Sequence, residues 1–247
     1  MFEDSFDKVF KNKQKILFVF SHPDDAEISA GGTIARLVAA KKSVCIVKMT
    51  FGNKGSRQEI VSEKELATQR LNEDIMAMSI LGLKAENNVY LELPDGAIED
   101  DEKSLEKLVR IVRKFKPEII VTHNPEDIII RWSEGVNWIN HRDHRNTAKL
   151  AVDAAYPYSR DLLFFPHQIE NEGLGSHIVA EFLFTDYFDH RDTVAIDVTD
   201  YIDTKVKALS AHSSQYTVED AQAAADFFTK LDDSGNRYER FRYVIAD

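Results

Sequence analysis

The sequence predicts an α/β fold built on a mostly parallel sheet. Short apolar runs alternate along the chain with longer stretches of helical periodicity. The first run, ILFVF at 16–20, is continuously apolar, as in a strand that is buried on both faces. Strand–helix units at this spacing form right-handed crossovers, which align successive strands in parallel.

Four strand–helix pairs account for the N-terminal part of the chain. Predicted strands cover 16–20, 44–49, 89–93 and 118–122, and predicted helices cover 28–40, 59–81, 105–115 and 143–155. Gly82 is expected to end the second of these helices as a C-cap residue. The stretch 124–140 shows no clear periodicity and is expected to be irregular.

The C-terminal part is less regular. It predicts strands at 178–184 and 194–198 and helices at 200–211 and 218–231, and the segment 242–245 is expected to be an edge strand or a tail. We expect a single domain over residues 1–247, in which the part after about 160 elaborates the same domain.

Composition excludes several classes of protein. Of 247 residues, 43% are hydrophobic and 30% are charged, which is ordinary for a globular protein with a full core. The net charge of −11 repels phosphate groups and argues against binding to nucleic acid or to an anionic membrane. Cys45 is the only cysteine, so no internal disulfide forms. No apolar stretch reaches the ~20 residues of a membrane span and no signal peptide is evident, so a cytoplasmic location is expected.

Polar side chains follow the first and fourth predicted strands, at the carboxyl edge where sites form in parallel sheets. The first strand runs into SHPDD at 21–25, and the fourth is followed by HNP at 123–125 and HRDH at 141–144. His22, Asp25 and His144 offer two imidazoles and a carboxylate, a set suited to one Zn²⁺ ion with a position left for water. The adjacent Asp24 must point elsewhere and could act as a base toward that water.

The two histidines of the HRDH motif have a spacing that brings both rings to one side of a helix. His141 and His144 are three residues apart, and Asp143 between them could orient an imidazole. Blander interpretations stay open, since the two aspartates could cap a helix and the histidines could be surface residues. The two clusters together are harder to explain by chance.

These motifs resemble those of the LmbE-like, or PIG-L-like, zinc-dependent N-acetylglucosaminyl deacetylases. SHPDDAEISAGGTIARL resembles the family's opening motif, HRDH its second and KVKALSAHSSQ its third, in order, over about residues 15–216. The resemblance implies a Rossmann-like three-layer fold and hydrolysis of an acetamide on an N-acetylglucosamine-containing glycoside, releasing acetate and a free amine. It also implies a small N-acetylated sugar as partner and a homo-oligomer, a hexamer or trimer.

The resemblance assigns roles by motif position. His22, Asp25 and His144 would bind zinc, and Asp24 would be the general base. His141, in protonated form, would stabilise the oxyanion with Asp143 behind it, and Arg70 and His212 would lie near the substrate, although His212 could also be a polar residue near a helix end. Asp95 lies at the carboxyl end of the third predicted strand and could contact substrate hydroxyls. For Arg70 a surface salt bridge, and for Asp95 a turn-forming role, are equally good interpretations.

The chain departs from the family pattern at Arg142, where proline is frequent, and in the loop 126–140, which contains Trp132 and Trp138 and is expected to shape substrate choice. Other hydrolases fit poorly, because a binuclear H-x-H-x-D-H motif would need histidine at Ile139 and no G-x-S-x-G motif occurs. A non-catalytic sugar- or metal-binding protein, or a hydrolase of a different amide, remains an alternative.

Overall fold

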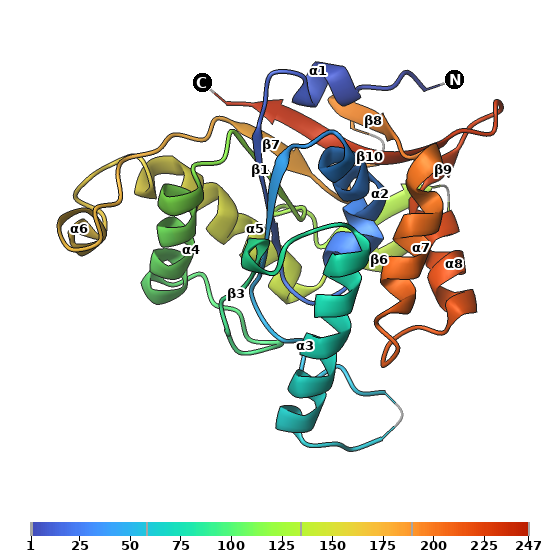
Figure 1. Ribbon diagram of the computed structural model, residues 1–247, viewed down its shortest axis with the longest axis horizontal. Helices are drawn as coiled ribbons and strands as arrows, with labels where there is room; N and C mark the ends of the chain where they lie inside the picture. Colours follow the sequence, from blue (N-terminus) through green and yellow to red (C-terminus); the bar gives the residue numbers. More distant parts are fainter. Residues whose placement is uncertain (1, 58, 134, 189, 247) are drawn as a thin grey trace.

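The computed structural model describes residues 2–57, 59–133, 135–188 and 190–246. Its main sheet has the strand order β3-β2-β1-β4-β7-β10-β8, with β9 paired to β10 (Figure 1). The strands are β1 Lys15–Phe20, β2 Ser43–Lys48, β3 Asn88–Tyr90, β4 Ile119–Thr122, β7 Glu181–Phe184, β8 Thr193–Asp197, β9 Lys230–Leu231 and β10 Arg237–Ile245. The pairs from β3 through β7 are parallel, and β10 runs antiparallel to both of its neighbours, which confirms the mostly parallel sheet.

Helices cover both faces of this sheet and make three layers (Figure 1). The longer helices are α2 Asp25–Ala39, α3 Glu63–Ile80, α4 Glu102–Phe115, α5 Arg142–Asp153, α7 Ile202–Ser210 and α8 Val218–Phe228. Short helices occupy α1 Phe6–Phe10 and α6 Pro166–Glu170, and single helical turns occupy Ala85–Asn87, Ala154–Tyr158 and Thr199–Tyr201. No helix among the described residues is both long and apolar enough to cross a bilayer.

The central strand shows why the sheet is buried on both sides. Phe18 and Phe20 of β1 belong to the core beneath α2 and α7, whereas Leu17 and Val19 belong to the core beneath α4 and α5. All four side chains are fully buried, and each burial stabilises the fold by about 1.5–3 kcal/mol. The alternating directions along a strand explain why a run without polar residues is required here.

Helix ends follow local chemistry. At the start of α3, Ser62 accepts a hydrogen bond from the Glu65 backbone while the Glu65 side chain accepts one from Ser62, which forms a capping box. At its end, Gly82 adopts a φ of +81°, as the C-cap prediction requires.

The helix predicted at 218–231 ends at Phe228, and Lys230–Leu231 form β9 instead. Two further predictions about the chain were wrong. The stretch 124–140 contains a hairpin, β5 Ile129–Ser133 paired antiparallel with β6 Val136–Ile139. Its order depends on aromatic contacts with segments distant in sequence, which local periodicity does not reveal. The C-terminal segment is an interior strand, since β10 lies between β7 and β8. Charged residues in β10 are typical of an edge strand of a sheet. Glu239 is nevertheless buried, and its Oε1 forms an ion pair with Lys205 Nζ at 2.6 Å.

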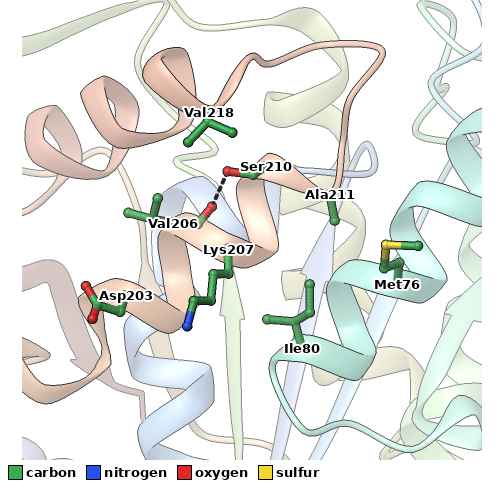
Figure 2. A pocket seen from close by; sticks show the side chains of 8 residues that line it. All are labelled: Met76, Ile80, Asp203, Val206, Lys207, Ser210, Ala211 and Val218. Carbon is green, nitrogen blue, oxygen red and sulfur yellow. Dashed lines mark hydrogen bonds between the residues drawn. The ribbon is translucent and has the colours of Figure 1, made fainter.

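A groove of about 570 Å³ lies between α3 and α7 near the start of α8 (Figure 2). Its lining is mainly apolar, and Met76 and Ile80 of α3 face Val206 and Ala211 across it. It contains none of the histidines discussed above, so the candidate site lies elsewhere.

Candidate metal centre and active site

The chain turns sharply where β1 ends, and the turn separates two adjacent carboxylates. Asp24 has a left-handed backbone with a φ of 91°, a conformation that aspartate tolerates better than most residues. One oxygen of Asp25, Oδ2, accepts a hydrogen bond from the His22 backbone N–H at 2.8 Å, whereas Asp24 Oδ2 accepts one from the Tyr216 hydroxyl at 3.0 Å. Asp24 makes no side-chain capping bond to α2, so helix capping does not explain its presence.

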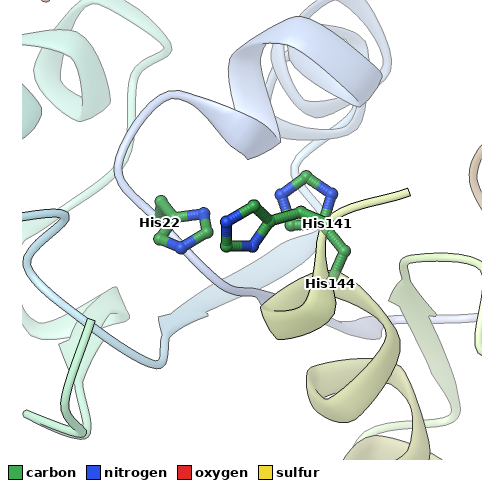
Figure 3. A group of neighbouring side chains, drawn as sticks. All are labelled: His22, His141 and His144. Atoms are coloured by element: carbon green, nitrogen blue, oxygen red, sulfur yellow. The ribbon is translucent and has the colours of Figure 1, made fainter. Parts of the chain in front are cut away.

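The structure brings together the three residues predicted to bind metal. Asp25 Oδ2 lies 3.3 Å from His22 Nδ1, and Asp25 Oδ1 lies 3.3 Å from His144 Nε2. Figure 3 shows the rings of His22, from the end of β1, and of His141 and His144, from the start of α5, converging on one region. The three rings offer nitrogens that lie within 4.8 Å of one another. Segments more than 110 residues apart thus meet at the carboxyl edge of the sheet.

Two further carboxylates hold the other side of His22. Its Nε2 lies 3.3 Å from both Asp95 Oδ1 and Asp143 Oδ2. Asp143 is itself fixed, because its carboxylate accepts backbone hydrogen bonds from Gly96 at 2.8 Å and Ile98 at 3.2 Å. Asp143 therefore orients His22 rather than His141, and leaves the Nδ1 of His22 facing Asp25.

The charges around His22 are unbalanced without a cation. Burial favours the neutral ring, but the carboxylate of Asp25, with support from Asp143 and Asp95, raises the pKa of His22 well above its usual value. Burial likewise opposes ionisation of Asp25, yet His144 and His22 hold its pKa well below the usual range. Imidazole and carboxylate donors of this kind suit Zn²⁺. The residues present therefore fit a zinc ion, whose positive charge would compensate these carboxylates.

His123 is a member of the site whose role sequence reasoning missed. Its ring stacks on that of His144, with centroids 3.9 Å apart and planes 4° from parallel, and its Nε2 lies 3.4 Å from Asp25 Oδ2. Burial and the neighbouring His144 lower its pKa to about 3, so the ring is neutral. Since the Ser21 backbone N–H donates to Nε2 at 3.2 Å, binding a metal through that atom would break this bond. The signal was available, because His123 directly follows β4.

His141 lies at the outer side of the cluster. It is exposed, and its ring centroid is 5.1 Å from that of His22. Its Nδ1 accepts a hydrogen bond from the Asp143 backbone N–H at 3.1 Å, which places the proton of a neutral ring on Nε2. Burial and the nearby His22 and His144 lower its pKa. In this arrangement the lowered pKa favours a neutral His141 ring, and a protonated His141 during the reaction stays a prediction.

Asp24 interacts electrostatically with the buried histidine His212. Burial and the negative charge of Asp25 raise the pKa of Asp24 to about 6. His212 is almost fully buried, and its Nε2 lies 2.8 Å from Glu27 Oε1. Burial disfavours its charged form, but Glu27 and Asp24 raise the pKa of His212 to about 9. His212 is thus a cationic neighbour of Asp24.

The other residues predicted to contact substrate also have protein partners. Arg70 is buried and donates to the carbonyls of Gly52 and of Gly55, the latter at 3.0 Å, so it supports the glycine loop after β2 instead of forming a surface salt bridge. Asp95 belongs to the site, because it contacts His22 and its Oδ2 also accepts from the Lys54 backbone N–H at 2.7 Å.

Arg142 and the hairpin lie next to the histidine cluster in the sequence, and each contacts a different part of the protein. Arg142 pairs with Glu99 and thereby contacts the loop that carries Asp95. Trp132 of the hairpin stacks on Phe227 of α8 with ring centroids 4.8 Å apart. Ile139, the last residue of β6, is 75% exposed and lies two residues before His141. The hairpin therefore ends in an exposed apolar side chain two residues before His141.

The sequence matches a protein family and several named proteins. Residues 17–155 match the family model described as PIG-L, GlcNAc-PI de-N-acetylase. The chain is 29% identical to a diacetylchitobiose deacetylase from Thermococcus kodakarensis, over 95% of this chain and 85% of that protein. It is 26% identical to a 1D-myo-inositol 2-acetamido-2-deoxy-alpha-D-glucopyranoside deacetylase from Rhodococcus erythropolis, over 87% of this chain and 84% of that protein.

Among solved structures, the chain is similar to an N,N'-diacetylchitobiose deacetylase from Pyrococcus horikoshii, with a TM-score of 0.80, 27% identity, and coverage of 97% of this chain and 87% of that one. A 4-carboxy-2-hydroxymuconate hydratase from Pseudomonas putida shares the fold alone, with a TM-score of 0.67 and 19% identity over 95% of this chain and 97% of that one. Because the family model covers more than half of its residues, this chain belongs to the PIG-L family.

Proposed function

We propose that this chain is a zinc-dependent hydrolase that removes the acetyl group from an N-acetylated amino sugar, an N-acetylglucosamine-containing glycoside. The named relatives deacetylate sugars that carry an acetamido group. The observation that carries the proposal is the convergence of His22, Asp25 and His144 beside a carboxylate, Asp24, that is directed to a different partner. Metal binding alone would not require that fourth residue.

Zinc would be held by His22, Asp25 and His144. When bound, it would polarise the acetamide carbonyl and make a water molecule more acidic. The carboxylates of Asp95 and Asp143 would keep the His22 ring oriented, since each lies 3.3 Å from its Nε2. Neutral His123, stacked on His144, would restrict the rotation of that ring.

Asp24 would act as the general base. Its Oδ2 is engaged by Tyr216, which leaves Oδ1 to accept a proton from the attacking water. The water oxygen then bonds to the acetamide carbon, the C–N bond breaks, and the amine nitrogen takes up a proton, which yields acetate and a free amino sugar. A positioned base of this type contributes about 10²–10⁴-fold to the rate.

His141 would act as a hydrogen-bond donor toward the developing oxyanion. Because Nδ1 accepts a hydrogen bond from the Asp143 backbone N–H, the proton of the neutral ring is on Nε2, which can donate it to the oxyanion. Removal of one such donor commonly costs about 10²–10³ in kcat.

Acetate release tests the proposal directly. We would incubate the zinc-loaded protein with N-acetylglucosamine, diacetylchitobiose and an N-acetylglucosaminyl inositol glycoside, with N-acetylated lysine as a non-sugar control. We expect acetate release from at least one sugar and none from the control. Bound zinc with no release from any sugar would instead support a non-catalytic metal-binding protein, and release only from the control would support a hydrolase of a different amide.

A further inference from the structure

A buried carboxylate on α3 clamps the turn between α7 and α8. Glu73 is 8% exposed. Its Oε1 accepts hydrogen bonds from the Ser213 hydroxyl and the Ser214 backbone N–H, each at 2.9 Å, and its Oε2 accepts one from the Ser214 hydroxyl at 2.7 Å. Gln69, one turn earlier on α3, donates to Oε1 at 3.1 Å. Three hydrogen bonds from the turn to one buried carboxylate fix the turn in place.

The clamped turn carries a side chain that reaches the proposed base. Tyr216 follows the two serines, and its backbone N–H donates to the His212 carbonyl at 3.0 Å, which continues the turn. Its hydroxyl donates to Asp24 Oδ2 at 3.0 Å. Within the part of the chain that the structure describes, no other side chain is recorded as donating a hydrogen bond to the Asp24 carboxylate. Hydrogen bonds thus join Glu73 to Ser214 and Tyr216 to Asp24, and the backbone of the turn joins Ser214 to Tyr216.

We infer that Glu73 is a positioning residue: it holds the 212–216 turn so that the Tyr216 hydroxyl fixes one oxygen of Asp24 and leaves the other to accept the proton of the attacking water. This inference rests on the proposed role of Asp24. Such a support is needed because the Asp24 backbone is left-handed and its carboxylate makes no hydrogen bond to the N-terminus of α2. It also explains the two serines after His212, which supply both hydroxyl donors to Glu73.

The test is a double-mutant cycle on the zinc-loaded, full-length protein. We would compare Glu73→Ala and Tyr216→Phe with Glu63→Gln, an exposed carboxylate at the start of the same helix that does not contact the turn. Because a displacement of about 1 Å can cost about 10²-fold, we expect kcat to fall at least tenfold for the first two variants, with KM and zinc content unchanged. The Glu63→Gln control is expected to keep the wild-type kcat.

The decisive measurement is made in an Asp24→Asn background. If Glu73 acts through Asp24, adding Glu73→Ala causes no further loss of kcat. Losses that multiply, or a rise in KM at constant kcat, would overturn the inference. Should Glu73→Ala fail to fold, the Ser213→Ala/Ser214→Ala variant removes the same two hydroxyl contacts from the other side and enters the same cycle.

Crystal structures separate this inference from the proposed function. If the zinc-loaded wild type releases no acetate from any sugar, the proposed function is wrong, but the positioning can still be measured. A Tyr216 hydroxyl beyond hydrogen-bonding distance of Asp24 in Glu73→Ala, or in the double serine variant, supports the clamp. An unchanged contact near 3.0 Å overturns it.

Discussion

Asp24→Asn separates the proposed chemistry from the fold. Asparagine has the same shape, tolerates a left-handed backbone, and can still accept a hydrogen bond from the Tyr216 hydroxyl. The side chains of His22 and Asp25, which are proposed to bind zinc, are unchanged. We therefore expect a folded protein with normal zinc content that has lost its base, with kcat reduced about 10²–10⁴-fold, or about 2.7–5.5 kcal/mol.

The same substitution should stabilise the metal-free protein. Burial and Asp25 raise the pKa of Asp24 from 3.8 to about 6, which corresponds to about 3 kcal/mol of native-state cost for the ionised group at about 1.36 kcal/mol per pH unit. Because the folded pKa is the higher one, the contribution of Asp24 to wild-type stability falls as pH rises from about 4 to 6 and stays lower above that. Asp24→Asn removes this loss, so its advantage is absent below pH 4 and approaches 3 kcal/mol at pH 8.

Acetate release, zinc analysis and urea unfolding at pH 4 and pH 8 measure these effects. Asp233→Asn, an exposed turn residue with the same change in charge, is the matched control and should alter neither property. Wild-type kcat in Asp24→Asn would refute the base assignment. A metal-free variant that is less stable than wild type at pH 8 would refute the electrostatic reasoning.

Three further outcomes are expected. His144→Ala should lower zinc content more than His123→Gln, and the reverse order would show that His123 is the ligand. Chelation should abolish acetate release while leaving the far-ultraviolet circular dichroism unchanged, since the core does not depend on the site; simultaneous unfolding would contradict this. Asp74→Asn should destabilise the protein by about 3–5 kcal/mol at pH 7, because it leaves buried Lys48, now 2.8 Å from Asp74, without its counter-ion. Burial alone would raise the pKa of Asp74, but the charge of Lys48 outweighs burial, and the net result is a lowered pKa. The contribution of Asp74 to wild-type stability should therefore be lost as pH drops below about 4. An Asp74→Asn variant with the same acid sensitivity as the wild type would contradict this.

The sequence was sufficient to predict the parallel half of the sheet and the meeting of His22 with His144. Continuous apolar strands and the rule that sites form at carboxyl edges do not depend on distant contacts. The hairpin and β10 were mispredicted because aromatic packing and the buried Glu239 pair stabilise them, and these contacts join segments far apart in sequence. The roles of the site residues, the single domain and the oligomeric state stay predictions.

The sequence alone also did not predict which histidines Asp143 and His123 contact. Local spacing left open which imidazole Asp143 orients, and the family resemblance placed it behind His141, but folding brings its carboxylate against His22, more than 100 residues away. The stacking of His123 on His144 likewise requires β4 and α5 to be placed first.

Both tryptophans of the chain lie in one aromatic cluster, where the hairpin packs against α8. Their rings are 6.1 Å apart, and Trp132 stacks on Phe227. Intrinsic fluorescence of the unmodified protein therefore reports on this one contact, next to the chain that leads into His141. A spectral change upon addition of a sugar would reveal movement of the hairpin without any attached label.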